Sequence, residues 1–301
     1  MIKILSAAYH MNIGDRKSAR LLKGYIDTIN NHESILYGYD GTCLSSREEV
    51  EKFCADTDAI IIGAGGIFHN ANYNQVFYFT DPELYKYIPC SLIIMATGFN
   101  QDYDSVGFSD HQEEILQAEL GRADLIGMRT ENDRYLAISY GADKSKTFVC
   151  PDPLLFIGYN SGIFDKIVAS LWVDDWKESI KRNLSGYDFV FINHEDTTFR
   201  FSQYAECDFV ITNRFHGQLL SFAYNKPCFS IESNIKHRFA REFLYTTNLQ
   251  HWTEDDSDFL SSFQRFLIDK ENMRYYIHGR LVELKNIFGS FLLKIEKVLN
   301  D

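Results

Sequence analysis

The sequence predicts an α/β protein in which helices cover parallel sheets in two consecutive domains. Short apolar runs alternate with amphipathic stretches over the first half of the chain. Some runs, such as Ala59–Ile62, contain no polar residue, which is typical of strands buried on both faces of a sheet. The segment Pro151-Asp152-Pro153 then separates this half from a second unit. Strand–helix alternation of this kind predicts doubly wound, Rossmann-like parallel sheets facing a cleft.

The first domain is predicted to span residues 1–150. An apolar run over 2–7 opens it, and an apolar face at helical spacing follows, which predicts a helix over 16–30. The same two patterns predict the remaining elements. Strands are expected at 34–39, 59–62, 92–96 and 125–128, and helices at 47–55, 110–121 and 130–140.

The second domain is predicted to span residues 151–301 and to be reduced. A helix is expected over 165–183, and only one clear strand, at 189–193, falls between the boundary and Phe209. A full Rossmann-like domain would contain another strand there. Further elements are expected as a short helix at 200–206, strands at 209–211 and 227–231 with a helix between them, and helical structure over 254–299.

The composition restricts the classes of partner. The chain of 301 residues has a formal net charge of -12, whereas nucleic-acid and membrane surfaces are bound mainly through basic patches. We therefore expect no nucleic-acid partner. The six cysteines show no CxxC spacing, and several lie in or beside apolar runs, so we expect them to be reduced. The apolar N-terminal stretch is too short for a signal peptide and no apolar run is long enough to span a membrane, which predicts a cytoplasmic protein.

Residues 208–236 carry the strongest indication of a binding site. An apolar strand ends before Arg214 and His216, a helical pattern begins there, and Lys236 follows the next strand. Ligands of parallel sheets collect at the carboxyl ends of strands, where helix N-termini offer free N–H groups. An Arg, a His and a Lys at that edge predict a site for a small, highly charged anion. The alternatives are an ion pair of Arg214 with Asp208 or another acid, a His216 that caps or packs, and a solvated Lys236.

The first domain offers a second group of candidates. Arg129 ends the predicted strand 125–128, with Glu131 as its alternative ion-pair partner. Gly65 and Gly66 follow a buried strand, where they either admit a ligand to backbone N–H groups or make a tight turn. The dinucleotide fingerprint G-x-G-x-x-G is absent because Phe68 stands at its third glycine, so NAD binding is disfavoured.

Asp15 and Asn12 complete the candidate residues. Asp15 either presents a carboxylate to the site or caps the helix over 16–30, and the cap is favoured because Asp is a common N-cap. Asn12 would shape the preceding loop. No HExxH or comparable ligand spacing occurs, so no metal site is expected.

Five short motifs, in order along residues 1–240, resemble those of polysaccharide pyruvyl transferases. They are Asn12-Ile13-Gly14-Asp15, the glycine-rich stretch 58–68, Gly127-Met128-Arg129-Thr130-Glu131, Asp152-Pro153, and Asn213-Arg214-Phe215-His216-Gly217 followed by Lys236. The resemblance implies a glycosyltransferase-B-like fold. It also implies transfer of a pyruvyl group from phosphoenolpyruvate to a sugar of a cell-surface or exopolysaccharide glycan, giving a ketal.

Under this resemblance the residues take distinct roles. His216 and Arg129 are the catalytic candidates, with His216 assisting either proton transfer or phosphate loss. The substrate-binding candidates are Arg214, Lys236, Asp15, Gly65, Gly66 and Asn12. Phosphoenolpyruvate is the donor substrate, with no further cofactor expected. A lipid-linked acceptor would bring the protein to the inner membrane face.

Two other functions remain open from the residues. A nucleotide-sugar glycosyltransferase would keep the fold, and Glu232, just after a strand, would then hold a ribose; otherwise Glu232 is a solvated loop acid. A non-catalytic member of the family is suggested by the short second domain.

Overall fold

The computed structural model describes residues 1–7, 13–29, 33–38, 43–69, 78–100, 107–157, 167–171, 175–192, 201–232 and 235–300. It divides into two compact units. Unit 1 comprises Met1–Pro153 with Asn286–Asp301, and unit 2 comprises Leu154–Lys285. The boundary after Pro153 lies within the Pro-Asp-Pro segment, and the C-terminal end of the chain groups with unit 1 instead of unit 2.

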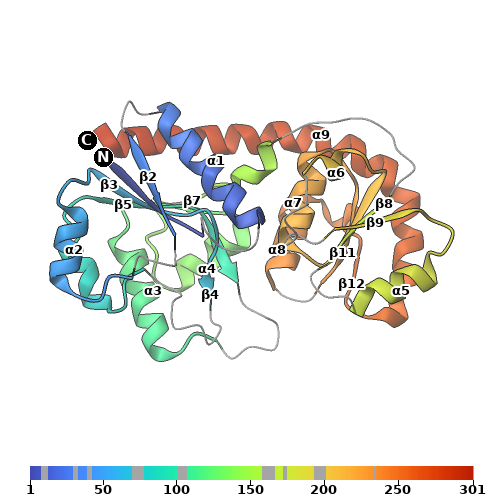
Figure 1. Ribbon diagram of the computed structural model, residues 1–301, viewed down its shortest axis with the longest axis horizontal. Coiled ribbons are helices and arrows are strands. Elements are labelled where there is room, and N and C mark those ends of the chain that lie inside the picture. Colours follow the sequence, from blue (N-terminus) through green and yellow to red (C-terminus); the bar gives the residue numbers. More distant parts are fainter. Residues whose placement is uncertain are drawn as a thin grey trace. The chain divides into compact units, whose positions relative to one another are not determined.

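Unit 1 is built on a seven-stranded sheet of order β2-β1-β3-β5-β6-β7, with β4 paired to β5 (Figure 1). Every pairing is parallel. Strand β2 pairs with one edge of β1, and β3 pairs with its opposite edge. The direction in which strands are added to the sheet therefore reverses between β1 and β3. The strands are β1 (Ile2–Leu5), β2 (Ser34–Tyr37), β3 (Ala59–Ile62), β4 (Gly65–His69), β5 (Ser91–Asn100), β6 (Leu125–Met128) and β7 (Thr147–Val149).

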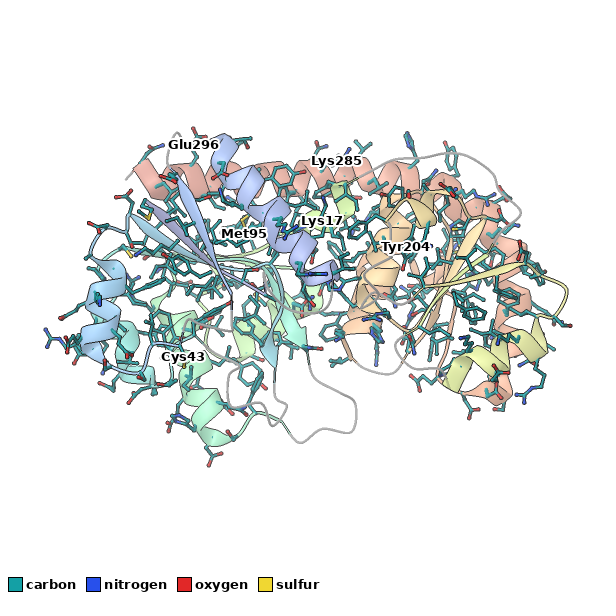
Figure 2. The ribbon with its side chains drawn as sticks, in the orientation of Figure 1. Lys17, Cys43, Met95, Tyr204, Lys285 and Glu296 are labelled. Carbon is teal, nitrogen blue, oxygen red and sulfur yellow. The ribbon has the colours of Figure 1, made fainter. Side chains whose placement is uncertain are left out.

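Helices flank this sheet where the sequence predicts them. Ser46, Ser109 and Thr130 each cap a helix by accepting a backbone N–H with the side-chain oxygen. Buried apolar side chains, among them Met95 on β5, fill the space between sheet and helices (Figure 2). The helices are α1 (Ile13–Ile29), α2 (Arg47–Cys54), α3 (Asp110–Arg122) and α4 (Glu131–Ser139), with the 3-10 turn η2 (Pro82–Tyr87). A second 3-10 turn, η3 (Pro153–Phe156), crosses the boundary into unit 2.

Unit 2 contains a five-stranded parallel sheet of order β12-β11-β10-β8-β9. Its strands are β8 (Ile167–Ser170), β9 (Phe189–Ile192), β10 (Phe209–Thr212), β11 (Cys228–Ile231) and β12 (Trp252–Thr253). Its helical elements are α5 (Asp175–Asn183), α6 (Ser202–Ala205), α7 (Phe215–Ala223), α8 (Ile235–Leu244), η4 (Thr247–Leu249) and the start of α9 (Asp256–Asn300).

The helix predicted over 165–183 is wrong in its first part. The structure has strand β8 over Ile167–Ser170, and the helix α5 begins only at Asp175. Ile167 and Val168 are β-branched residues that favour strands, and β8 pairs with β10 on one side and β9 on the other. The expectation of a reduced second domain depended on the absence of this strand.

The long helix α9 supplies core side chains to both units. In unit 2, Phe263 packs against Phe209 of β10 and Phe229 of β11, with ring centroids 5.6 and 5.5 Å apart. In unit 1, a Cβ at Gly127 of β6 would lie 2.5 Å from the Phe291 ring, so glycine is required for this approach. Within the segments that the structure describes, no helix combines the length and apolarity that a membrane crossing requires.

Glu119 of α3 is a buried carboxyl group in the core of unit 1. Only 1% of the residue is exposed, and its Oε2 accepts a hydrogen bond of 2.6 Å from the Tyr85 hydroxyl. Burial raises the pKa of Glu119 from 4.5 to about 7, against the opposing effect of that hydrogen bond. Between these values the folded protein holds a proton that the unfolded chain has released.

Folding stability should therefore fall as the pH rises through this window. Relative to Glu119→Gln, which keeps an acceptor for Tyr85, the wild type should lose roughly 3 kcal/mol of unfolding free energy between about pH 4.5 and pH 8. Urea denaturation of both proteins across this range measures the difference. Parallel pH profiles for the two proteins would contradict the prediction.

Candidate functional site

The switch point of the unit 1 sheet lies between β1 and β3, where parallel α/β sheets bind ligands. Asp15 follows β1 at this edge. The helix α1 begins at Ile13, so Asp15 lies in its first turn and the prediction of Asp15 as the N-cap is wrong. A carboxylate in the first turn is favourable because it faces the positive end of the helix dipole. Asn12 lies outside the described residues.

The glycines after β3 lie against two other candidate residues. Gly65 has φ +128°, and a Cβ there would lie 3.3 Å from the Asp15 Oδ1. A Cβ at Gly66 would lie 3.6 Å from an Arg129 guanidinium nitrogen. The structure thus brings Asp15, Gly65, Gly66 and Arg129 together at one edge of the sheet.

Arg129 extends across the end of β5. The residue is 3% exposed, its backbone N–H donates to the Thr97 carbonyl, and its guanidinium donates to the Phe99 carbonyl at 3.4 Å. A Cβ at Gly98 would lie 2.7 Å from the Arg129 Cζ, so the guanidinium occupies the space that this glycine leaves.

Asp133, rather than Glu131, supplies the nearby negative charge. Glu131 pairs with Arg134 at 2.8 Å. Asp133 is buried and accepts hydrogen bonds of 2.8 Å from the Phe99 N–H and from the Thr130 hydroxyl. Burial raises the pKa of Asp133, and the charge of Arg129 opposes that rise. Sequence analysis missed Asp133, although Thr130-x-x-Asp133 has the spacing of a helix cap.

In unit 2, Arg214 and His216 lie at the start of α7, directly after β10. Arg214 is the N-cap residue in an extended conformation, and Phe215 is already helical. Strand alternation therefore does not orient the two side chains. Both residues are buried, with 3% and 5% exposed.

Close packing fixes this helix start. The Arg214 N–H donates to the Thr212 hydroxyl at 3.0 Å. A Cβ at Gly217 would lie 2.9 Å from the Thr212 Cβ and would overlap its hydroxyl oxygen. Glycine at 217 lets α7 begin directly against the end of β10.

Lys236 lies in the first turn of α8, near Arg214. The next residue, His237, is 3% exposed. Burial lowers the pKa of His237 well below its usual value, and the charges of Lys236 and Arg214 lower it further. The structure thus gathers Arg214, His216 and Lys236 at the N-termini of two neighbouring helices, with a neutral His237 beside them.

The alternative pairing of Arg214 with Asp208 is not what the structure shows. Asp208 instead pairs with Lys270 at 2.6 Å and with Arg274, both on α9. These contacts lie at the start of β10, whereas Arg214 follows the end of that strand.

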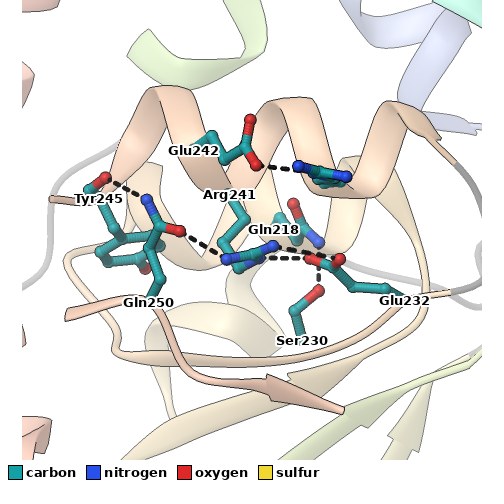
Figure 3. Close-up of polar contacts among 8 residues, drawn as sticks. Gln218, Ser230, Glu232, Arg241, Glu242, Tyr245 and Gln250 are labelled. Atoms are coloured by element: carbon teal, nitrogen blue, oxygen red, sulfur yellow. Dashed lines mark hydrogen bonds and ion pairs between the residues drawn. The ribbon is translucent and has the colours of Figure 1, made fainter. Parts of the chain in front are cut away.

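Glu232 follows β11 but is neither solvated nor in a loose loop. It is 4% exposed and forms a two-armed ion pair with Arg241 of α8, whose Nη2 lies 3.3 Å from Oε2. Arg241 also donates to Gln250, which donates to the Tyr245 carbonyl at 3.0 Å (Figure 3). Gln218 of α7 donates to Ser230 beside them. This network fixes Glu232 directly after β11.

Metal binding has no support in the described parts of the chain, where no three His, Cys, Asp or Glu residues are grouped as metal ligands. The chemistry available is instead that of buried cations and helix N-termini, which suit an anion.

Comparison with known proteins places this arrangement in a family context. Residues 201–234 match the family polysaccharide pyruvyl transferase. This confirms the resemblance over the stretch that holds Arg214 and His216, and it supports a role as a transferase that modifies glycans. Comparison with curated proteins gives no match.

Solved structures share the fold at low sequence identity. The UDP-GlcNAc 2-epimerase of Methanocaldococcus jannaschii, in complex with UDP-GlcNAc and UDP, is 9% identical with a TM-score of 0.53, covering 88% of this chain and 92% of that chain. A UDP-glucose:anthocyanidin 3-O-glucosyltransferase is 9% identical with a TM-score of 0.59, and the match covers 99% of this chain and 98% of that chain. The lipopolysaccharide outer core galactosyltransferase WaaB is 8% identical with a TM-score of 0.54, covering 99% and 98%. These likenesses confirm the glycosyltransferase-B-like fold.

The packing of Gly217 gives a direct test of the helix start. Gly217→Ala should lower the unfolding free energy by about 1–3 kcal/mol, because the new methyl group overlaps Thr212. Gly279→Ala is the matched control, since it lies within α9 of the same unit and its Cβ would meet open space. That control should be neutral or more stable by up to about 1 kcal/mol. Equal effects of the two substitutions in urea denaturation would refute the close packing.

The network around Glu232 gives a second test. Glu232→Ala should cost about 3–5 kcal/mol, because it leaves the Arg241 charge buried without its carboxylate. The control is Glu242→Ala, which removes the carboxylate of the Arg238–Glu242 pair at the surface of α8, the helix that carries Arg241. It should cost less than about 1 kcal/mol. Denaturant unfolding of both variants measures the contrast. A loss below 1 kcal/mol for Glu232→Ala would show that the buried pair is not structural.

Proposed function

We propose that the protein transfers the pyruvyl group of phosphoenolpyruvate to two hydroxyls of a glycan, forming a cyclic ketal. The observation that carries the proposal is the family match over residues 201–234, which includes the buried Arg214 and His216 at the start of α7. The cationic character of that helix start agrees with a phosphorylated donor.

The donor's charges suit the groups that each unit provides. Phosphoenolpyruvate carries a phosphate and a carboxylate close together. Arg214 and Lys236 offer cations at the N-termini of α7 and α8, where backbone N–H groups add to the attraction for an anion. Arg129 provides a guanidinium that can hold a carboxylate or phosphate by paired donors. We assign the donor to Arg214 and Lys236, at the helix starts of unit 2.

The reaction needs a proton and a departing phosphate. Protonation of the methylene carbon leaves a cationic C2, a sugar hydroxyl attacks that carbon, and the C2–O bond to phosphate breaks; a second hydroxyl closes the ketal. His216 assists either the proton transfer or the phosphate loss. Fixed positive groups contribute most when they stabilise the charge that develops as phosphate leaves.

A nucleotide-sugar glycosyltransferase is the competing function because the fold is shared with UDP-sugar enzymes. In the sequence, the residue that would support a glycosyltransferase is Glu232, as a ligand of the ribose. That carboxylate is engaged by Arg241 in a buried pair, so ribose binding there would require the pair to open. The geometry therefore favours the phosphoenolpyruvate donor.

Ligand-induced stabilisation distinguishes the two functions. Phosphoenolpyruvate at about 100 times its Kd should add about 2.7 kcal/mol of stability, whereas UDP and GDP should add none. His216→Ala and Arg214→Ala should abolish this gain. Arg20→Ala, which removes an exposed guanidinium from α1 of unit 1, should keep it. Thermal unfolding with each ligand, beside pyruvate and phosphate alone, gives the comparison.

The outcomes separate clearly. Stabilisation by phosphoenolpyruvate that disappears in His216→Ala and persists in Arg20→Ala supports the pyruvyl donor site and leads to acceptor screening. Stabilisation by a nucleoside diphosphate alone would replace the proposal with a glycosyltransferase. Stabilisation by none of them, tested with and without acceptor sugars, would leave a non-catalytic role.

A further inference from the structure

A surface pocket of about 620 Å³ lies at the edge of the unit 2 sheet, where β12 is the outermost strand. One side is lined by residues 248 and 250–255, which include β12, and the other side by the N-terminal part of α9. The described residues that line it all fall between Asn248 and Asp269, so the pocket is separate from the residues assigned to the donor. Its volume is in the range of about 300–1,000 Å³ that is usual for ligand sites.

His251 joins the two sides of the pocket. The Ser230 N–H of β11 donates to the His251 carbonyl at 3.1 Å, which fixes the backbone just before β12. The His251 side chain is only 9% exposed, and its Nε2 lies 3.1 Å from Oδ2 of Asp269 on α9. Its ring also packs against the Phe266 ring of α9, with centroids 5.8 Å apart. These contacts hold β12 and α9 at a fixed spacing, so the pocket is formed before any ligand binds.

Trp252 supplies an aromatic surface to the strand side of the pocket. The residue is 38% exposed, and the Arg241 guanidinium of α8 lies over its ring, 4.8 Å from the centroid. Arg241 is held there by Glu232 and Gln250 (Figure 3). A second cation on this ring would be repelled by Arg241, whereas an uncharged group can still pack on the exposed part of the indole.

The helix side of the pocket offers hydrogen-bond donors and acceptors one turn apart. Arg265 is exposed, and its Nη2 donates to the Ser262 hydroxyl at 3.1 Å, which orients the guanidinium and leaves further N–H groups to donate. Asp269 lies four residues further along α9 and offers carboxylate oxygens, with 33% of its side chain exposed. A sugar hydroxyl both donates and accepts hydrogen bonds, so it can be bound by a donor and an acceptor at the same time.

The acidic residues of the pocket have structural roles of their own. Asp255 accepts the Ser257 N–H at 2.7 Å and so holds the turn into α9. Asp258 lies in the first turn of α9, where a carboxylate faces the positive end of the helix dipole. Asp269 is engaged by His251. Their negative charge repels an anion, so the pocket does not suit a second phosphorylated ligand, and an uncharged, hydroxyl-rich ligand fits it best.

We propose that this pocket is a second binding site that holds a neutral sugar of a glycan without acting on it. The C–H face of the sugar ring packs on Trp252, and its hydroxyls bind Arg265 and Asp269. A glycan held here by one sugar stays close to the protein, which raises the effective concentration of its other sugars. Binding at this pocket needs no donor, so the inference does not depend on the proposed pyruvyl transfer.

Titration with neutral trisaccharides of glucose, galactose, mannose and N-acetylglucosamine tests the site, with calorimetry and tryptophan fluorescence as readouts and no phosphoenolpyruvate present. At least one of the four should bind saturably and change the fluorescence. Trp252→Ala and Arg265→Ala should each weaken that binding at least tenfold. Tyr275→Ala is the matched control, because it removes an aromatic ring that is 89% exposed on α9 of the same unit, and it should bind as the wild type does.

Three results would overturn the inference. The first is that none of the four trisaccharides binds. The second is binding that stays unchanged in both Trp252→Ala and Arg265→Ala, which would place the sugar elsewhere. The third is tighter binding of glucosamine trisaccharide, which carries ammonium groups, than of any neutral one, which would make the pocket a cation site. Thermal unfolding of Arg265→Ala, whose side chain is exposed, shows that a loss of binding does not come from unfolding.

Discussion

Parallel pairing of the strands is the constraint on which the rest of this structure depends. Because all strand pairs in each sheet are parallel, the carboxyl ends of neighbouring strands meet at one edge of that sheet. Residues far apart in the sequence, such as Asp15 after β1 and Arg129 after β6, therefore lie near the adjacent glycines 65 and 66. In unit 2 the same rule places the starts of α7 and α8 side by side. In both units, regular parallel strand–helix topology is therefore enough to bring the candidate residues together.

Close approach of the backbone is the second requirement, and it explains why glycines accompany the charged residues. The Arg129 guanidinium fills the space beside Gly98, and α7 can begin against Thr212 only because residue 217 lacks a side chain. Such contacts place large polar groups inside the protein, where an isolated charge is costly. Asp133 near Arg129 reduces that cost, and its own hydrogen bonds to Phe99 and Thr130 hold it in place.

The sequence revealed most strands and helices because buried parallel strands and amphipathic helices leave strong local patterns. It failed at β8, where Ile167-Val168 continues into a stretch that also fits a helix, and only pairing with β9 and β10 decides between them. Candidate residues could be located from their position after a strand, which holds for Arg129, Arg214 and Lys236. The ion pairs of this unit could not be predicted in the same way. Glu232–Arg241 and Asp208–Arg274 each join two elements that come into contact only in the folded protein.

The charge balance of unit 2 links these observations to binding. Asp208 and Glu232 are already engaged by Lys270, Arg274 and Arg241, so these acids do not compete for a ligand at the starts of α7 and α8. Burial lowers the pKa of His237 and so keeps it neutral, and the charges of Lys236 and Arg214 lower that pKa further. A phosphate bound there would offset the effect of those two charges, since an opposite charge favours the protonated imidazole.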